Sequence, residues 1–329
     1  MSARRNSKLG CLADDLTGAL EIGAKFAAAG ISAAVGTKHC WDQDATALVI
    51  DTETRHSTPA EAAAIVNRLA REARGFRLLY KKTDSTLRGN IGVELAAVAE
   101  AFPGARVIYV PAYPLMGRTV RGGILHVDGV PVHLTEFAHD PLNPIRESHI
   151  PTLVAADCVH VLDADTDEEV ARVAEGLLQT DGTLLAAGPA ALAEAIAARI
   201  DVPRTAPAPF PKARRCLVVN GSLHPLSGQQ AAAMASDTDW MIMSQSGGPG
   251  IGQKVRALVD SFEALIVFGG DTAFEILQAL ECNVLRPIGE IVPGVPLSRV
   301  LYGGRELIIM SKAGGFGPVD ILARMRSLL

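Results

Sequence analysis

The chain has 329 residues, of which 48% are apolar, and five scattered cysteines that form no CxxC pair. This length and composition predict two domains of ordinary size with buried cores, and they exclude a disordered or disulfide-framed protein. The formal net charge of −5, without long blocks of like charge, gives no footprint for nucleic acid or an anionic membrane. No apolar run reaches transmembrane length and the N-terminus lacks a signal-peptide pattern, so we expect a cytoplasmic protein with small-molecule partners.

The first 200 residues alternate short apolar runs with Ala-rich amphipathic segments, which is typical of parallel α/β sheets. Helices are expected at 59–73 and 167–179, because each begins with a threonine followed three residues later by glutamate, the capping-box pattern. Segment 111–147 is rich in Pro, Gly and His and predicts a hairpin, turning at Asp128-Gly129, with a long loop. Strands are expected near 8–13, 32–36, 47–50, 77–82, 106–110 and 158–162.

The proline-rich run at 201–213 has no periodic apolar face and predicts a linker between domains of residues 1–205 and 206–329. The second domain repeats the strand–helix alternation. Its expected strands are RCLVVN, WMIMS, ALIVFGG, a run near 283 and ELIIMSK, and its expected helices begin near 225, 252 and 272, with one more at the end of the chain.

Three glycine-bearing segments follow strands of this second domain. They are Asn220-Gly221-Ser222, then Gly269, Gly270, Asp271 and Thr272, and finally the run from Lys312 to Gly317 that contains Gly314 and Gly315. In a parallel sheet these junctions share the carboxyl edge, where backbone N–H groups and helix N-termini favour a phosphate. Each segment alone is more simply explained by turn chemistry, and the three together leave turn chemistry and a nucleotide cradle as equal alternatives. No GxxxxGK[ST] and no strand-linked GxGxxG occurs, so a cradle here would be a phosphate site of another type.

In the first domain a strand ends directly in Asp14-Asp15-Leu16-Thr17-Gly18. A kinase could use this pair by letting one aspartate accept the proton of an attacking hydroxyl while the other orients substrate or metal. The alternative is that one of them merely caps the following helix.

A second polar cluster, residues 81–90, combines two lysines, an acid, three hydroxyls and an arginine after another strand. This composition suits a polyhydroxy carboxylate: Arg88 could bind the carboxylate, Asp84 and Ser85 the hydroxyls, and a lysine could offset phosphate charge. The alternative is a solvated turn that caps a helix. Mg²⁺ held mostly by phosphates would leave little trace in the sequence, and the scattered histidines match no metal motif.

Several segments together resemble the four-carbon acid sugar kinase family, in the family's order and over nearly the whole chain. They are ADDLTGALEIGAKFAAAG, YKKTDSTLRGN, PAYPLMGRTVRGGILHVDGVPV, DPLNP, VVNGSLHP, FGGDT, EIVPGVP and KAGGFGPVD. The resemblance implies two three-layer α/β/α domains with mostly parallel sheets and the active site in the cleft between them. It also implies transfer of the ATP γ-phosphate to a terminal hydroxyl of a threonate-, erythronate- or 3-oxo-tetronate-like acid.

Residue by residue, the resemblance implies that Asp14, Asp15, Lys82, Asp84, Ser85 and Arg88 face the sugar acid, with Arg118 as a further substrate contact. It implies that Ser222, Gly269, Gly270, Asp271, Thr272, Gly314 and Gly315 face ATP. The sequence does not decide whether Asp14 or Asp15 is the base; Asp15 has a slight preference, because the turn after it should leave it nearer the cleft. ATP and Mg²⁺ are the expected cofactors.

The chain departs from the family pattern in being shortened, between Pro144 and Val159 and around 236–262, and in reading AAGPAALA at 186–193 where a GSAGLA-like element is expected. An impaired or substrate-shifted kinase therefore stays open, as do a non-catalytic sugar-acid sensor that closes around its ligand and a nicotinamide-dependent oxidoreductase. The missing GxGxxG counts against the last. The sequence leaves the substrate's stereochemistry and any homo-oligomer undetermined.

Overall fold

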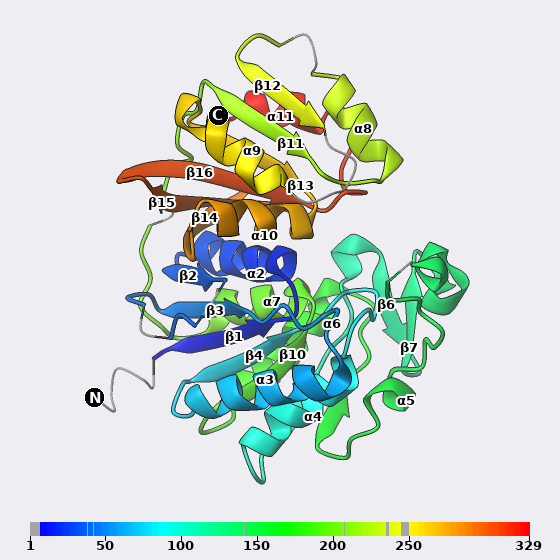
Figure 1. The fold of residues 1–329 in the computed structure, drawn as a ribbon. Helices are drawn as coiled ribbons and strands as arrows, with labels where there is room; N and C mark the ends of the chain where they lie inside the picture. Colours follow the sequence, from blue (N-terminus) through cyan, green and yellow to red (C-terminus); the bar gives the residue numbers. More distant parts are fainter. Residues whose placement is uncertain are drawn as a thin grey trace.

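The computed structural model describes residues 7–329 apart from 38, 42, 141, 207, 235–236 and 245–249. Within this part of the chain, one thirteen-stranded sheet runs through the whole molecule, in the order β12-β11-β13-β16-β15-β14-β2-β3-β1-β4-β10-β5-β9 (Figure 1). The sheet has an N-terminal half, from β2 to β9, and a C-terminal half, from β12 to β14. Each half carries its own helices.

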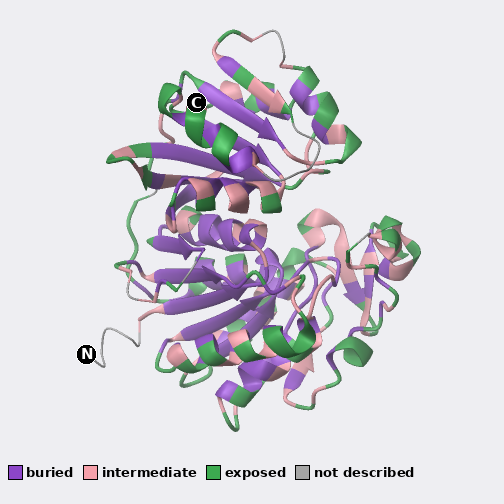
Figure 2. Ribbon diagram, viewed as in Figure 1, coloured by how far each residue is buried: buried purple, intermediate pink, exposed green. Residues whose placement is uncertain are grey.

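The N-terminal half is a parallel sheet. Its strands are β1 (Leu9–Ala13), β2 (Ala33–Gly36), β3 (Ala47–Asp51), β4 (Leu78–Lys82), β5 (Val107–Tyr109), β9 (Val159–Val161) and β10 (Leu184–Gly188). Helices α3 (Pro59–Glu72) and α4 (Ile91–Ala101) pack together, and α2 (Leu16–Ala28), α6 (Asp167–Leu178) and α7 (Ala190–Arg199) form a second group. The central strands are buried throughout, as expected for a sheet covered on both faces (Figure 2).

The C-terminal half combines parallel strands with an antiparallel meander. Its strands are β11 (Cys216–Asn220), β12 (Trp240–Ser244), β13 (Ala264–Phe268), β14 (Val284–Val292), β15 (Val295–Tyr302) and β16 (Arg305–Lys312). Helices α9 (Ile251–Leu258) and α10 (Gly270–Ala279) form one pair, and α8 (Pro225–Ala232) and α11 (Ile321–Arg326) form another. Side chains of β11 alternate between the two faces of the sheet and pack into two different apolar cores, so both faces of this sheet are covered.

The two halves are joined by antiparallel pairing of β2 with β14, which aligns Val35 with Leu285 and Gly36 with Val284. Helix α2 lies at this junction and contacts β14, β15 and α10 as well as its own half (Figure 1). The larger apolar core also crosses the junction, because it includes residues of β1 and of β13. The mostly parallel, layered α/β class expected from the sequence is confirmed, and the shared sheet fixes the halves against each other.

A small lobe projects from the N-terminal half, formed by β6 (Arg118–Arg121), β7 (Ile124–Val127) and β8 (Val130–Pro131). Short 3-10 turns (Pro114–Met116, Val132–Leu134 and Glu136–His139) and helix α5 (Ile150–Val154) complete this region. The predicted turn at Asp128-Gly129 is confirmed, since both residues have positive φ angles of 50° and 83°. The lobe is a three-stranded meander, one strand more than the expected hairpin.

Most of the predicted elements are confirmed, and two strands were missed. The Thr58 capping box has both of its hydrogen bonds. Thr166 accepts from the Glu169 N–H, whereas the Glu169 carboxylate accepts from Asp165 N and not from the cap itself. The expected strands omit β10 and β15. The described residues of 201–213 form neither helix nor strand, and no described helix has the length and apolar character needed to cross a bilayer.

Candidate active site

The acidic pair Asp14-Asp15 and the polar cluster of residues 81–90 meet at one edge of the N-terminal sheet. Ala13, the last residue of β1, lies in register with Asp51 of β3 and with Lys82 of β4. Residues that follow these three strands therefore converge, as the carboxyl ends of parallel strands do.

Arg55, which follows β3, binds both members of the acidic pair. Its Nε and Nη2 donate to the two Asp14 carboxylate oxygens at 2.8 and 3.0 Å, and its Nη1 donates to Asp15 Oδ2 at 2.6 Å. The Asp84 carboxylate lies 3.8 Å from Nη2. A planar guanidinium that grips a carboxylate by two bonds holds it in a fixed orientation.

Asp14 is thus a locked, buried anion. Its side chain is 1% exposed. Burial alone would raise its pKa, but Arg55, followed by Lys81, holds the pKa of Asp14 below the ordinary value. Burial would likewise lower the pKa of Arg55, and Asp14, Asp15 and Asp84 instead raise it well above the usual range. Asp14 is therefore suited to orienting Arg55 and poorly placed to exchange a proton.

Asp15 has a different environment, although it is adjacent in sequence. It is the N-cap of α2, with Oδ1 accepting from the Gly18 N–H at 2.9 Å, and its side chain is 21% exposed. The alternative that one aspartate caps the helix is thus confirmed for Asp15. Capping occupies Oδ1 and leaves Oδ2 facing Arg55 and the neighbouring half of the molecule.

The two lysines of β4 have separate partners. The Lys82 ammonium lies 3.4 Å from Glu21 Oε2 and close to Gly18, since a Cβ added at Gly18 would come within 2.9 Å of it. The fully buried Lys81 instead pairs with buried Glu94 at 3.0 Å. Lys82 therefore places positive charge beside the Asp15 cap. Lys81 instead forms a buried ion pair with Glu94.

Asp84 and Arg88 form a second fixed ion pair. Arg88 Nη2 and Nε lie 2.7 and 3.1 Å from the Asp84 carboxylate, which also accepts from Thr86 N. Burial would raise the pKa of Asp84, but Arg88 and Arg55 hold it well below its usual range. Arg88 keeps 30% of its side chain exposed, and its Nη1 reaches Asp140 at 3.4 Å. Asp84 therefore orients an arginine that can still contact a ligand.

Ser85 and Arg118 are less tied to this cluster. Ser85 is half-buried beside Asp84. Arg118 begins β6 in the lobe, donates to the Met116 carbonyl, and has a buried Nε without an acceptor in the described part of the chain. No described contact joins Arg118 to Asp84 or Arg88.

In the C-terminal half, the three glycine segments do lie together. Asn220, Phe268 and Lys312 end their strands in register across β11, β13 and β16. A Cβ added at Gly221 would come 2.0 Å from Thr272 Oγ1.

The glycine segment after β16, from Lys312 to Gly317, contacts the segment after β11 that contains Ser222. Added Cβ atoms at Gly314 and Gly315 would come 2.0 Å from Ser222 Oγ and 2.9 Å from His224 Nε2. Any side chain on these glycines would collide with its neighbour, so the contact depends on glycine. Ser222, Gly269, Thr272, Gly314 and Gly315 thus form one cluster.

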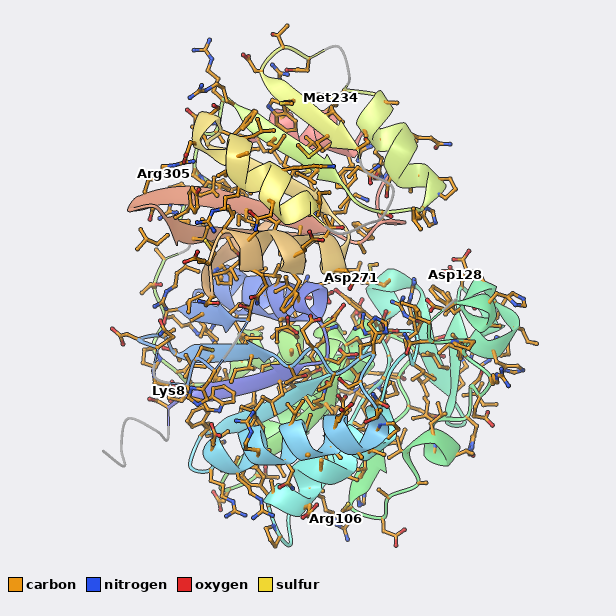
Figure 3. The ribbon with its side chains drawn as sticks, viewed as in Figure 1. Lys8, Arg106, Asp128, Met234, Asp271 and Arg305 are labelled. Carbon is orange, nitrogen blue, oxygen red and sulfur yellow. The ribbon has the colours of Figure 1, made fainter. Side chains whose placement is uncertain are left out.

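The polar cluster of the N-terminal half and the glycine cluster of the C-terminal half meet at the N-termini of α2 and α10. A Cβ added at Gly270 would lie 2.6 Å from Thr17 Oγ1 and 4.0 Å from Asp15 Oδ2. The next residue, exposed Asp271, lies at the end of α10 that faces the N-terminal half (Figure 3). Two helix N-termini, which favour negative charge, therefore flank the position of Asp15.

Further carboxylates surround this meeting point. Buried Asp51 has an Oδ2 without a hydrogen-bond partner among the described residues, and burial, followed by Glu53, raises its pKa well above the usual value. Partial burial, together with Asp15 and Asp271, also raises the pKa of Glu53. This excess of negative charge suits a cation.

Arg55 is the main functional candidate that the sequence reasoning missed. The segment DTETR follows the predicted strand at 47–50, so its place at a strand end, like those of Asp14 and Lys82, is visible in the sequence. Its role as the shared partner of two carboxylates depends on register between β1 and β3, which no local pattern gives.

Comparison with known families matches both halves of the chain. Residues 9–160 match the model of a sugar-binding N-terminal domain, and residues 248–322 match that of a nucleotide-binding C-terminal domain.

Two solved structures share the fold. A Haemophilus influenzae protein superposes with a TM-score of 0.74 at 19% identity, covering 97% of this chain and all of that one. A Bordetella bronchiseptica domain of unknown function, crystallised with citrate as a domain-swapped dimer, has a TM-score of 0.55 at 29% identity and covers 98% of each chain.

Curated relatives extend over the whole chain. A D-threonate kinase of Bordetella bronchiseptica is 31% identical over 396 aligned positions, covering 96% of each chain, and a 3-oxo-tetronate kinase of Salmonella typhimurium is 27% identical, covering 96% of this chain and 98% of that one. The first alignment is longer than the 329 residues of this chain, so the relative carries segments that this chain lacks, as the shortened pattern predicted. The chain belongs to the four-carbon acid sugar kinase family.

Proposed function

We propose that this protein is an ATP-dependent kinase that phosphorylates a terminal hydroxyl of a four-carbon sugar acid of the threonate, erythronate or 3-oxo-tetronate type. The observation that carries the proposal is the contact between the two clusters, where Gly270 of the nucleotide-side cluster lies against Thr17 and Asp15. Phosphoryl transfer needs the donor and acceptor sites to adjoin in this way, since positioning and charge stabilisation supply most of its catalysis.

In this proposal Asp15 is the general base. Its Oδ2 accepts one hydrogen bond from Arg55 and also faces the glycine turn of α10, whereas Arg55 holds both Asp14 oxygens. Asp14 then orients Arg55, and Arg55 fixes Asp15. A positioned base of this kind contributes about 100- to 10,000-fold to a rate.

The sugar acid would lie against the cations of the N-terminal cluster. Arg88 keeps 30% of its side chain exposed and Arg118 has an Nε without an acceptor among the described residues, so either could take the carboxylate. Lys82, Asp84 and Ser85 would contact hydroxyls or offset phosphate charge. The unpartnered donor on Arg118 is the feature that supports its inclusion, because buried donors normally have an acceptor.

ATP would bind the cluster of Ser222, Gly269, Gly270, Asp271, Thr272, Gly314 and Gly315. Close packing of its glycines brings backbone amides and the N-terminus of α10 to one place, which is the arrangement that proteins use for phosphates. The domains would divide at residues 1–205 and 206–329, with the irregular segment between them as linker.

Mg²⁺ fits the carboxylates at the junction. The orphaned oxygen of Asp51 and the mutual repulsion of Glu53, Asp15 and Asp271 mark a place where a hard cation would relieve negative charge. The described residues hold no group of three His, Cys, Asp or Glu side chains ready to bind a metal, so ATP phosphates would complete the coordination. Glu53 and Asp271 are the residues that would hold it. When bound, Mg²⁺ neutralises charge that develops on the transferred phosphoryl group.

The experiment is a coupled ADP-release assay with Mg-ATP and a panel of D- and L-threonate, D- and L-erythronate and their 2-oxo and 3-oxo relatives, with ³¹P NMR of the product. Turnover with a terminal phosphate ester identifies the substrate. ATP binding without turnover on any member would reject these acids, and silence without ATP binding would favour the sensor. A cytoplasmic location and any homo-oligomer remain proposals, which fractionation and light scattering would test.

A further inference from the structure

Lys312, the last residue of β16, is a buried cation whose charge no acidic side chain balances in the described part of the chain. The residue is 1% exposed. Its ammonium donates to the carbonyls of Ala313, Gly314 and Phe316 at 2.8, 2.9 and 3.0 Å, and it lies 4.4 Å from the centre of the Phe268 ring. All three ammonium protons are therefore used by one loop, residues 313–318, which we call the glycine loop.

Two further side chains hold the same loop from the same side. Ser227 Oγ donates to the Gly314 carbonyl at 2.6 Å. Gln230 Nε2 donates to the carbonyls of Phe316, Gly317 and Pro318 at 3.0 to 3.1 Å. Five carbonyls of the glycine loop thus point toward Lys312, Ser227 and Gln230.

This arrangement determines where the loop amides point. In a planar trans peptide the N–H of each residue is directed opposite to the carbonyl of the residue before it. Carbonyls held at Ala313, Gly314 and Phe316 therefore turn the N–H groups of Gly314, Gly315 and Gly317 away from Lys312. None of these three amides donates to a described acceptor, whereas the Phe316 amide is used internally, by the Ala313 carbonyl.

We propose that Lys312 is a positioning residue for nucleotide binding, which fastens the carbonyls of the glycine loop and thereby presents three free amides and a positive charge to a polyphosphate. The inference rests on the proposed function and deepens it. It explains why an ammonium is buried without a carboxylate: a nearby acid would cancel the charge that the phosphate needs.

The charge of Lys312 also makes the interaction sensitive to pH. Burial lowers the pKa of Lys312 to about 8. Phe268, Ser227 and Gln230 carry no titratable proton in this range. The titratable side chain that faces the glycine loop from the neighbouring segment is His224, which lies across Gly315. Affinity for the nucleotide should fall as pH rises through 8, since the cation is lost above its pKa.

The test compares Lys312→Met and Lys312→Arg with Lys212→Met, a control at an exposed lysine of the linker. Calorimetric titration with Mg-ADP and with inorganic tripolyphosphate measures the anion affinity. We expect Lys312→Met to weaken both by about 10- to 100-fold, as for loss of a charged hydrogen-bonding group, with the KM of the acid unchanged. Lys312→Arg should restore part of the affinity and abolish its fall above pH 8.

A second measurement needs no nucleotide. Hydrogen exchange of the Phe316 amide, read by NMR in the ligand-free protein, should become faster in Lys312→Met than in the Lys212→Met control. Unchanged exchange, or unchanged anion affinity in a variant that melts like the wild type, would overturn the role of Lys312. Failure of the wild type to bind Mg-ADP would instead overturn the proposed function, while faster exchange would still support Lys312 as the residue that orders the loop.

Discussion

Replacing Arg55 by methionine should strongly destabilise the protein. The substitution removes two bonds of 2.8 and 3.0 Å to Asp14 and one of 2.6 Å to Asp15. The side chains of Arg55 and Asp14 are only 11% and 1% exposed, so water cannot replace the lost partner. Removing one member of a buried ion pair costs about 3–5 kcal/mol, and we expect a loss of this size in the free energy of unfolding at pH 7.

The same variant should show a characteristic pH dependence. Because the folded pKa of Asp14 lies below its ordinary value of 3.8, the ion pair stabilises the wild type above that value and loses its effect as pH falls through the folded pKa. The difference between wild type and Arg55→Met should therefore be largest at neutral pH and shrink in acid. Adding Asp14→Asn to Arg55→Met should recover part of the loss at pH 7, because the unpaired anion is gone.

Urea unfolding followed by circular dichroism, at pH 7 and at a series of pH values below 3.8, measures these differences. Arg68→Met is the matched control, since Arg68 pairs with Glu72 on the surface and is 62% exposed. Such a pair is worth about 0.3–0.5 kcal/mol. If Arg55→Met cost no more than Arg68→Met, the claim that Arg55 organises the two aspartates would be refuted.

Three further substitutions test other parts of the structure. Gly315→Leu should lower ATP affinity by about tenfold or more in a calorimetric titration, because its Cβ would come 2.9 Å from His224; unaltered affinity would count against the glycine cluster as the ATP site. Lys81→Met should lower unfolding stability by about 3–5 kcal/mol, since it leaves buried Glu94 without its cation, and a loss below 1 kcal/mol would show that the pair is solvated. Thr58→Ala should cost about 1 kcal/mol through loss of the capping box and leave turnover unchanged; a turnover defect would link α3 to the site.

Of the two strands that the sequence missed, one has no visible boundary and the other carries residues that argue against a strand. Strand β10 reads LLAAG, and its alanines continue into the helix that follows, so no boundary is visible. Strand β15 contains Pro296 and Ser298, residues that argue against a strand. Tertiary pairing overrides both signals, because β10 lies between β4 and β5 and β15 lies between β14 and β16.

The sequence predicted those site residues that directly follow a strand. The glycine segments meet because three strands end in register, which the α/β pattern predicts. The contact of Gly270 with Asp15 could not be predicted, because it depends on the pairing of Val35 with Leu285, about 250 residues apart in the chain. No local pattern carries information on such a pairing.

The most direct test of phosphoryl transfer at this junction is the turnover of Asp15→Asn, measured beside its affinity for ATP. Asparagine is also a good N-cap, so α2 should remain intact, and the substitution removes the basic Oδ2 together with its ion pair to Arg55. We predict a fall in turnover of about 100- to 10,000-fold with unchanged ATP affinity. Near-normal turnover in Asp15→Asn would contradict the account.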